Sequence, residues 1–295
     1  MEFKSGFVSI IGRPNVGKST LMNKLIGEKI AIVSDKPQTT RNRIQCIYTD
    51  NKSQIIFLDT PGIHKPNHKL GDFMVKTATK TLKEVDVILF VVDDSTKIGP
   101  GDRFIMQQLE QIKTPIILVM NKIDLMAQER FNILYQEYLA SGIFTDIVGI
   151  SAKDGLNLTS LVDKILAHFE EGPKYFPEDM ITDQPERVIV SEIIREKVLN
   201  YIEQEIPHGV AVEVTLMKKR KDKEIIDIHA TIYCEKKSHK GIIIGKEGRK
   251  LKGIGKSARI DIESLLGSKI YLELWVKIKE NWRNNAVNLR DLGYK

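Results

Sequence analysis

Residues 12–19, with the sequence GRPNVGKS, constrain the fold more than any other part of the chain. The segment follows the apolar run at 7–11 and precedes a helical stretch at 19–25. Two glycines at this spacing before Lys-Ser are typical of a loop whose backbone N–H groups wrap phosphate oxygens, placed between a strand and a helix. The segment therefore predicts a strand, a loop and a helix in succession, which is the first unit of an α/β domain.

Four more apolar runs follow, at 55–58, 87–92, 115–120 and 147–150. They are continuous and rich in β-branched residues rather than alternating, as expected of strands buried on both faces of a parallel sheet. Helical stretches such as 161–169 lie between and after them. We predict a doubly wound α/β domain over residues 1–171, with ligands bound at the carboxyl ends of its strands.

The pattern changes after a proline-rich stretch at 172–186, which we interpret as a linker. Residues 187–295 predict a helix at 187–206, then two half-buried strands joined by a charged hairpin tip at 218–224. The first strand alternates Val210, Val212, Val214 and Leu216 with other residues. An amphipathic helix around 251–265, an alternating strand at 270–278 and a last helix from about residue 281 complete a separate α+β domain.

Basic charge is concentrated in this second domain. Residues 187–295 hold 23 Lys and Arg against 15 Asp and Glu, whereas the rest of the chain holds 22 against 24. Nine of the basic residues lie in 236–259, beside a single acid, Glu247. A block of this density next to glycines is typical of a surface that binds a polyanion.

Other features indicate a cytoplasmic protein. No apolar run approaches the 18 or so residues of a membrane span, and the first residues lack the pattern of a secretory signal. Cys46 and Cys234 are far apart and without CxxC spacing, so neither a disulfide framework nor a zinc site is expected.

The loop at 12–19 predicts a nucleoside triphosphate ligand with Mg²⁺. Lys18 would reach the β- and γ-phosphates, and the Ser19 hydroxyl would bind the metal. The nucleotide-binding set at this loop is Gly12, Asn15, Val16, Gly17, Lys18, Ser19 and Thr20.

The choice of base rests on Asn121-Lys122-Ile123-Asp124, which follows the run at 115–120. Here the chain resembles the translation-factor-like GTPases, in which the aspartate of NKxD accepts hydrogen bonds from guanine. We expect Asp124 to be buried and adenine to be rejected strongly. Ser151-Ala152-Lys153 resembles the last base-contacting loop of that family.

The same resemblance assigns the switch residues. Asp59 is similar to the residue that supports the Mg²⁺ site without binding the metal directly. The N–H of Gly62 is similar to the group that senses the γ-phosphate. Thr39 or Thr40 would close onto the metal; spacing leaves both open, and we favour Thr40. We thus take Lys18, Thr40 and Gly62 as catalytic, and Ser19 and Thr40 as metal ligands.

One departure concerns Ile63, which stands where many relatives have a glutamine that orients the attacking water. Slow intrinsic hydrolysis is expected, with stabilisation supplied from elsewhere. Asn15 resembles an asparagine that helps to coordinate K⁺ in some GTPases of this kind.

The segment Ile242-Ile243-Ile244-Gly245-Lys246-Glu247-Gly248-Arg249 carries Gly-x-x-Gly between helical stretches. In the order helix-strand-strand-helix-helix-strand it resembles a type II KH domain, whose GxxG loop clamps an RNA backbone. The predicted RNA-binding residues are Ile243, Gly245, Lys246, Glu247, Gly248, Arg249 and Lys250. Trp275 and Trp282 are expected to pack in the fold rather than stack on bases.

The combination of a GTPase domain with a KH domain resembles the Era family of bacterial GTPases over essentially the whole chain. That resemblance implies GTP and GDP as ligands, binding near the 3′ end of 16S-type ribosomal RNA, a role in small-subunit maturation, and some peripheral association with the inner membrane. Tandem-domain ribosome GTPases need a second phosphate loop, and tRNA-modifying GTPases a C-terminal cysteine motif; the sequence has neither. A nucleotide-binding fold without activity is disfavoured by the intact Lys18, Ser19, Asp59 and Asp124.

Overall fold

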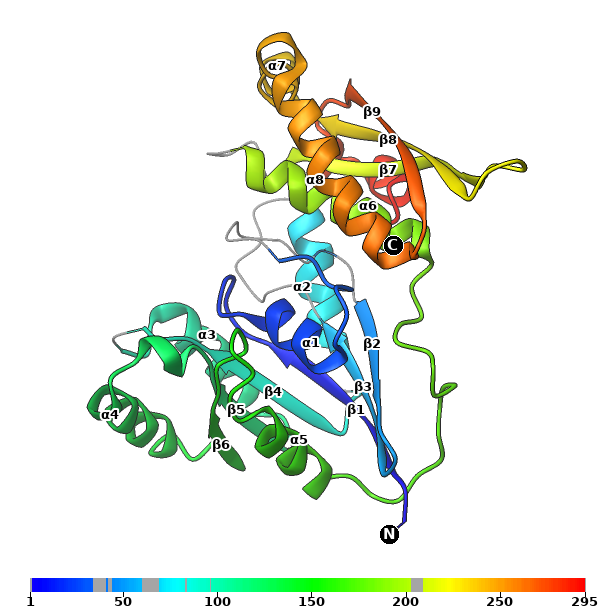
Figure 1. Ribbon diagram of the computed structural model, residues 1–295. Coiled ribbons are helices and arrows are strands. Elements are labelled where there is room, and N and C mark those ends of the chain that lie inside the picture. The colour runs from blue at the N-terminus through cyan, green and yellow to red at the C-terminus, as the bar shows by residue number, and fades with distance from the viewer. Residues whose placement is uncertain are drawn as a thin grey trace. The chain divides into compact units, whose positions relative to one another are not determined.

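The computed structural model describes residues 2–33, 41, 44–59, 69–82, 84–95, 97–202 and 209–294, with the backbone alone at 75–80. The chain forms two compact units (Figure 1). The first ends at Asp183 and the second begins at Gln184. Among the described residues, Ile32, Val33 and Lys69–Phe73 also group with the second unit. Each unit is treated separately below.

The first unit is built on a six-stranded sheet in the order β2-β3-β1-β4-β5-β6. All neighbouring strands are parallel except β2 and β3. This is the doubly wound α/β fold that the apolar runs predict. Its strands are β1 (Lys4–Ile11), β2 (Ile44–Thr49), β3 (Ser53–Asp59), β4 (Val87–Val92), β5 (Ile116–Met120) and β6 (Asp146–Gly149). Its helices are α1 (Lys18–Ile26), α3 (Pro100–Leu109), α4 (Gln128–Leu139) and α5 (Leu158–Ala167), and α2 (Lys69–Thr81) belongs to it from residue 74 onward.

Both faces of this sheet are covered, which explains why its central strands are apolar throughout. Along β4, Ile88 and Phe90 share a core with Ile105 of α3 and Leu134 of α4. The intervening Leu89 is also fully buried, and Figure 1 shows α1 and α5 on the other side of the sheet from α3 and α4. The carboxyl ends of β1, β3, β4 and β5 therefore open toward the loops that carry the sequence motifs.

Strand β2 is an element that the sequence patterns did not predict. It pairs antiparallel with β3, and the Asp50 carboxylate closes the turn by accepting from the N–H groups of Lys52 and Ser53 at 2.8 and 2.7 Å. The segment interpreted as a linker runs beside this edge strand, since the Ile47 N–H donates to the carbonyl of Ile181 at 2.9 Å. Those contacts cover part of an otherwise open sheet edge.

The second unit is a three-stranded sheet in the order β7-β8-β9, with β7 and β8 antiparallel and β8 and β9 parallel. Helix α6 packs against β7, and α8 packs against α6 and β9. A parallel pair needs a crossover, which α7 and α8 provide. The elements are α6 (Glu186–Tyr201), β7 (Ala211–Lys219), β8 (Ile225–Cys234), α7 (Lys237–Ile244), α8 (Arg249–Leu266), β9 (Lys269–Ile278) and α9 (Ala286–Asp291).

Two predictions about this unit are wrong. Leu216 was expected on the buried face of its strand, but a bulge between Val214 and Leu216 shifts the register and leaves Leu216 37% exposed. Trp275 was expected to pack, but it is 55% exposed on β9. Trp282 does pack: it is fully buried, its Nε1 donates to the Gly209 carbonyl at 2.9 Å, and its ring stacks on Tyr294.

Throughout the described ranges, no helix combines the length and the apolar character that crossing a membrane requires.

Candidate functional site

The phosphate-binding loop joins β1 to α1, as the sequence predicts. Gly12 and Gly17 have φ angles of 151° and 99°, in the region that residues with side chains avoid. A Cβ on Gly12 would lie 2.3 Å from the Val91 carbonyl oxygen, and one on Gly17 would lie 2.2 Å from Nδ2 of Asn121. The loop can keep this shape only with glycine at both positions.

Lys18 begins α1 and is only 7% exposed. Its Nζ donates to the carbonyl oxygens of Arg13 at 2.7 Å and Gly12 at 3.1 Å, so the ammonium lies inside the loop. Burial lowers its pKa to about 8, an effect partly offset by the carboxylate of Asp59. A lysine in this position can exchange backbone oxygens for phosphate oxygens with little rearrangement.

We expect nucleotide binding to take up protons at alkaline pH. Phosphate oxygens favour the charged ammonium and so raise the pKa of Lys18 on binding. At about pH 9 the free protein carries mostly neutral Lys18, so binding should take up nearly one proton, and affinity should fall as the pH rises above 8. At about pH 6.5 uptake should be near zero, since Lys18 is already charged.

Calorimetry in two buffers of different ionisation enthalpy measures the uptake. Lys18→Arg, which stays charged, should show none; equal uptake in both proteins would place the proton elsewhere.

The predicted metal ligand Ser19 lies beside the predicted metal-supporting residue Asp59. The Ser19 hydroxyl donates to Oδ2 of Asp59 at 3.3 Å, and Asp59 is fully buried at the end of β3. A hydroxyl and a carboxylate in contact are oxygen donors of the kind that Mg²⁺ prefers. Thr39, Thr40, Gly62 and Ile63 lie outside the described residues, and their predicted roles stay predictions.

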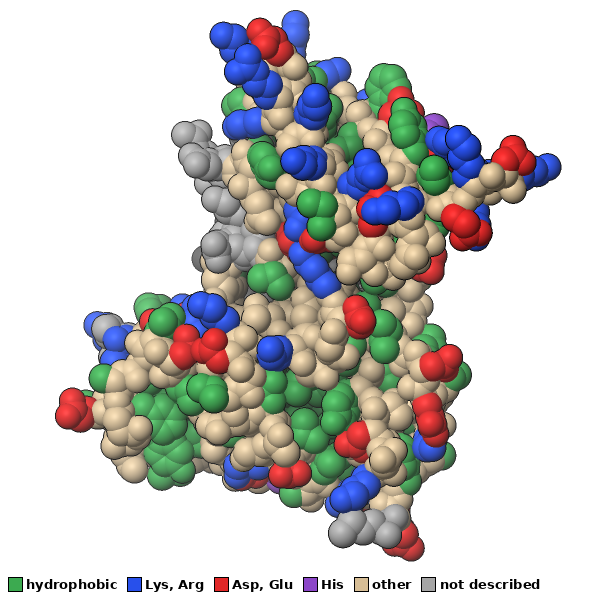
Figure 2. All heavy atoms as spheres, viewed as in Figure 1, with side chains coloured by type: hydrophobic (Ala, Val, Ile, Leu, Met, Phe, Trp, Pro, Cys, Tyr) green, Lys and Arg blue, Asp and Glu red, His purple; other side chains and the backbone are tan. Residues whose placement is uncertain are grey.

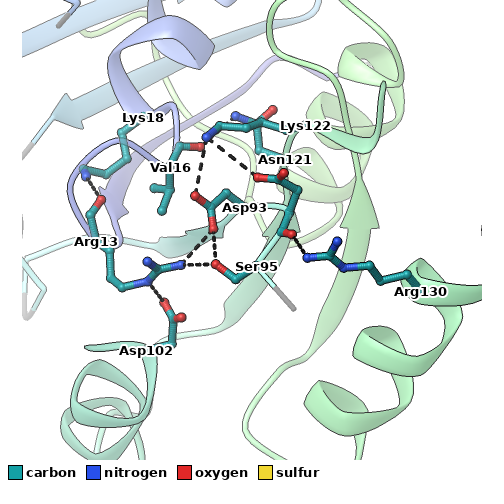
Figure 3. Close-up of polar contacts among 10 residues, drawn as sticks. Arg13, Val16, Lys18, Asp93, Ser95, Asp102, Asn121, Lys122 and Arg130 are labelled. Carbon is teal, nitrogen blue, oxygen red and sulfur yellow. Dashed lines mark hydrogen bonds and ion pairs between the residues drawn. The ribbon is translucent and has the colours of Figure 1, made fainter. Parts of the chain in front are cut away.

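Asn121 connects three predicted nucleotide-binding segments. Its Nδ2 donates to the Val16 carbonyl at 2.8 Å, and its Oδ1 accepts from the Ala152 N–H at 2.9 Å (Figure 3 shows the first partner). The side chain is 2% exposed. One amide therefore holds the phosphate loop, the NKxD loop and the Ser151–Lys153 loop together, in the arrangement that a nucleotide spanning them requires.

One of the predicted base-site residues differs from expectation. Asp124 was expected to be buried, but it is exposed in the short turn Ile123–Leu125 that follows β5. The residue is open to solvent, so a bound base would have to supply any burial of its carboxylate. Ser151 is fully buried, and its hydroxyl donates to Asp154 at 3.0 Å. This side chain shapes its own loop, while Ala152 is buried and Lys153 exposed.

A charged cluster that no sequence motif indicates lies between the phosphate loop and the NKxD loop (Figure 3). Its members are Arg13, Asp93, Ser95, Asp102 and Lys122. Asp93 contacts both Arg13, at 2.8 Å, and Lys122, at 3.4 Å. Arg13 and Asp102 are 89 residues apart, and nothing in their separate motifs indicates that they meet.

The GxxG segment forms a tight turn between α7 and α8. Gly245 and Gly248 have φ angles of 72° and 74°, and Glu247 also lies in the left-handed region at 54°. Lys246, Glu247, Arg249 and Lys250 are all exposed. Nη2 of Arg249 lies 2.8 Å from Oε2 of Glu247 in a solvent-exposed pair, which contributes little to stability. The basic side chains are therefore accessible to a phosphate backbone.

Ile243 is one of the predicted RNA-binding residues. It is fully buried, whereas its neighbour Ile242 is 41% exposed. The turn of α7 directs position 243 into the core of the unit and position 242 to solvent, a difference that the run of three isoleucines does not reveal. Ile242 is therefore the more accessible of the two for an apolar contact with RNA, and the RNA-binding role of Ile243 stays a prediction.

Basic residues continue from the GxxG loop along α8. Lys252, Lys256 and Arg259 are exposed and recur at three- and four-residue spacing, so they share one side of the helix with Arg249. Figure 2 shows Lys and Arg side chains gathered over α7 and along α8. The dense charge is evident from composition alone, whereas its alignment with the loop follows only from the 3.6-residue period of the helix.

Two family models match separate parts of the chain. The family described as 50S ribosome-binding GTPase matches residues 7–122, and the family described as KH domain matches residues 205–283.

Relatives that match over their full length identify the family more specifically than the two domain models do. The chain is 71% identical to GTPase Era of Alkaliphilus oremlandii (strain OhILAs) over 294 residues, covering 100% of both chains. It is 67% identical to GTPase Era of Clostridioides difficile (strain 630), covering 99% of both.

Two solved structures resemble the chain equally well, each with a TM-score of 0.95, 43% identity and 99% of both chains covered. One is a variant of Aquifex aeolicus Era bound to GDP.AlF4⁻, and the other is Era in complex with MgGDPNP and nucleotides 1506–1542 of 16S ribosomal RNA. A GTPase fold with its connected nucleotide loops, a KH domain and relatives this similar over their whole length show that the chain belongs to the GTPase Era family.

Proposed function

We propose that this chain is a Mg²⁺-dependent GTP-hydrolysing switch that binds 16S-type ribosomal RNA near its 3′ end during assembly and maturation of the small ribosomal subunit. The observation that carries the proposal is the Asn121 side chain, which joins three nucleotide-binding loops in a chain that also presents an exposed GxxG loop. The similar Era structure with MgGDPNP and 16S ribosomal RNA supports both ligands.

In the nucleotide site, backbone N–H groups of the loop at 12–19 would hold the phosphates, and Lys18 would neutralise the β- and γ-oxygens. Asp124 would accept from guanine, while Lys122 and Ala152 would border the base. Mg²⁺ would be held by the Ser19 hydroxyl and Thr40, with Asp59 behind them, and would stabilise charge on the transferring phosphate. Gly62 would sense the γ-phosphate.

In the RNA site, the GxxG turn would let a phosphate backbone approach Gly245 and Gly248 closely, and Lys246, Arg249 and Lys250 would add charge. The basic side of α8 would extend the attraction beyond the loop. Binding should therefore weaken steeply with added salt.

The test is to measure affinity for a 16S-type 3′-end RNA with GDPNP or GDP bound, together with GTP hydrolysis by the same preparation. RNA crosslinked to the protein in cells should map to the 3′ end of the small-subunit RNA. Crosslinks spread over unrelated RNAs would contradict the proposed target, and a protein that hydrolyses no GTP would contradict the switch.

We expect hydrolysis to be slow in the isolated protein and faster in K⁺ than in Na⁺. Ile63 cannot orient water, and Asn15, which is exposed in the phosphate loop with a φ of 67°, can contribute an oxygen to a cation near the phosphates. Single-turnover rates in the two chlorides at equal ionic strength test this. Asn15→Ala should remove the difference between the salts; identical wild-type rates would leave K⁺ without a role.

The proposal places the protein in the cytoplasm, with peripheral association with the inner membrane. The family resemblance supports the membrane contact, and the basic residues of α7 and α8 suit an anionic surface. Cosedimentation with vesicles containing anionic lipid, and not with neutral vesicles, is the expected result.

A further inference from the structure

Asp93 follows β4 and contacts both sides of the nucleotide site (Figure 3). Its Oδ1 accepts from Nη2 of Arg13 at 2.8 Å and from the Ser95 hydroxyl at 2.7 Å. Its Oδ2 accepts from Nζ of Lys122 at 3.4 Å. One carboxylate thus links an arginine of the phosphate loop to the lysine of the NKxD loop.

The Arg13 side of this link is firmly held. Nε of Arg13 donates to Oδ1 of Asp102 at 2.8 Å, and the Asp102 side chain is 1% exposed. Nη2 also donates to the Ser95 hydroxyl at 2.8 Å. A Cβ on Gly101 would lie 2.7 Å from Cδ of Arg13, so the start of α3 packs closely on the arginine stem. Asp93 therefore sits on a rigid support.

The Lys122 side is less constrained. Its side chain is 33% exposed, compared with 14% for Asp93. Asp94 approaches the same ammonium only to 4.0 Å and is itself 36% exposed. Burial alone would raise the pKa of Asp93, but the Ser95 hydrogen bond and the charges of Arg13 and Lys122 hold it below its usual value. Asp93 is consequently a fixed negative charge at physiological pH, facing a long, flexible cation.

We propose that Asp93 is a positioning residue for guanine-nucleotide binding, which acts by holding Lys122 against the rigid Arg13–Asp102 support. This inference rests on the proposed role of Lys122 at the base. A lysine side chain loses considerable rotamer freedom when it is ordered. Ordering it before the nucleotide arrives removes that cost from binding. The gain in affinity comes from contacts near the base, so it should be the same with or without a γ-phosphate.

The test begins with Asp93→Asn, which keeps the shape and an oxygen for Arg13 and Ser95 but removes the charge facing Lys122. Dissociation constants for GDP and GDPNP should rise together by about tenfold, with their ratio unchanged. KM for GTP should rise while kcat stays constant. Asp94→Asn is the matched control, because it removes a neighbouring charge at 4.0 Å; its dissociation constants should stay within about twofold of the wild type.

A double-mutant cycle with Lys122→Met identifies the route. If Asp93 acts through Lys122, Asp93→Asn should have little further effect in the Lys122→Met background, whereas its effect should persist beside a change elsewhere in the base site. A full, additive loss in that background would overturn the proposal, as would Asp93→Asn binding GDP like the wild type. A variant that fails to fold would make Asp93 a structural residue and overturn it too. Failure of the wild type to bind guanine nucleotides would instead contradict the proposed function.

Discussion

Asp124→Asn is expected to lower affinity for GTP by at least about a hundredfold and to shift preference toward xanthine nucleotides. The carboxylate can only accept hydrogen bonds, which suits the N1–H and exocyclic amine of guanine. An amide can donate to the C2 carbonyl of xanthine while still accepting from N1–H. For the same reason the wild type should prefer guanine over adenine nucleotides by at least about a hundredfold.

The structure indicates that this substitution should change base recognition without disturbing the fold. The turn that carries Asp124 is held by its backbone, with the Ile123 N–H donating to the Ile150 carbonyl at 3.1 Å and the Leu125 N–H to the Lys122 carbonyl at 2.9 Å. Asp124 itself is exposed, so the substitution should leave the melting temperature unchanged. Competition binding with GTP, XTP and ATP gives the preferences. Comparable wild-type affinities for GTP and ATP would refute the assignment of Asp124.

Replacing both Lys246 and Glu247 with aspartate is expected to cut RNA affinity by about tenfold or more, with a shallower dependence on salt. The pair is neutral and becomes doubly negative, and both side chains are exposed in the GxxG turn. Aspartate tolerates the left-handed conformation found at Glu247 better than most residues do. The fold and the basal GTP hydrolysis should therefore survive.

The chain offers a matched control at the hairpin tip between β7 and β8. Lys223→Asp with Glu224→Asp makes the same change of charge at two exposed residues of the same unit. RNA binding across a salt series, thermal stability and hydrolysis are measured on both variants. Equal losses in the two would mean that net charge matters and the GxxG turn does not. Unchanged binding in the loop variant would place the RNA on another surface.

The local sequence pattern was sufficient to predict much of the first unit. The central strands could be located because a strand buried on both faces must be apolar throughout, and the phosphate loop because its shape demands glycine at 12 and 17. The edge strand β2 was not predicted, because its sequence, Ile44–Thr49, mixes polar and apolar residues and lies next to the turn closed by Asp50. Such a strand is specified by its partner β3 as much as by its own residues.

The features that were not predicted, and the predictions that were wrong, depend on tertiary structure, which the local sequence does not reveal. Ile243 and Ile242 are chemically alike, and only the packing of α7 decides which one is buried. Leu216 follows the expected alternation until a bulge breaks the register. The cluster around Asp93 joins residues from separate loops and from helix α3, so no spacing along the chain could indicate it. The expected burial of Asp124 was wrong because the NKxD motif indicates a role for the carboxylate but does not reveal that the turn carrying it is exposed.

The placement of the two tryptophans has a practical consequence. The sequence contains only Trp275 and Trp282, and both belong to the second unit. Emission excited at the tryptophan band therefore reports on the KH unit alone, even in the intact protein. Trp275, at 55% exposure, is open to collisional quenchers such as iodide, whereas Trp282 is shielded. A single spectroscopic titration of the full-length chain can thus distinguish an event at the sheet surface of this unit from the loss of its core, without an attached dye.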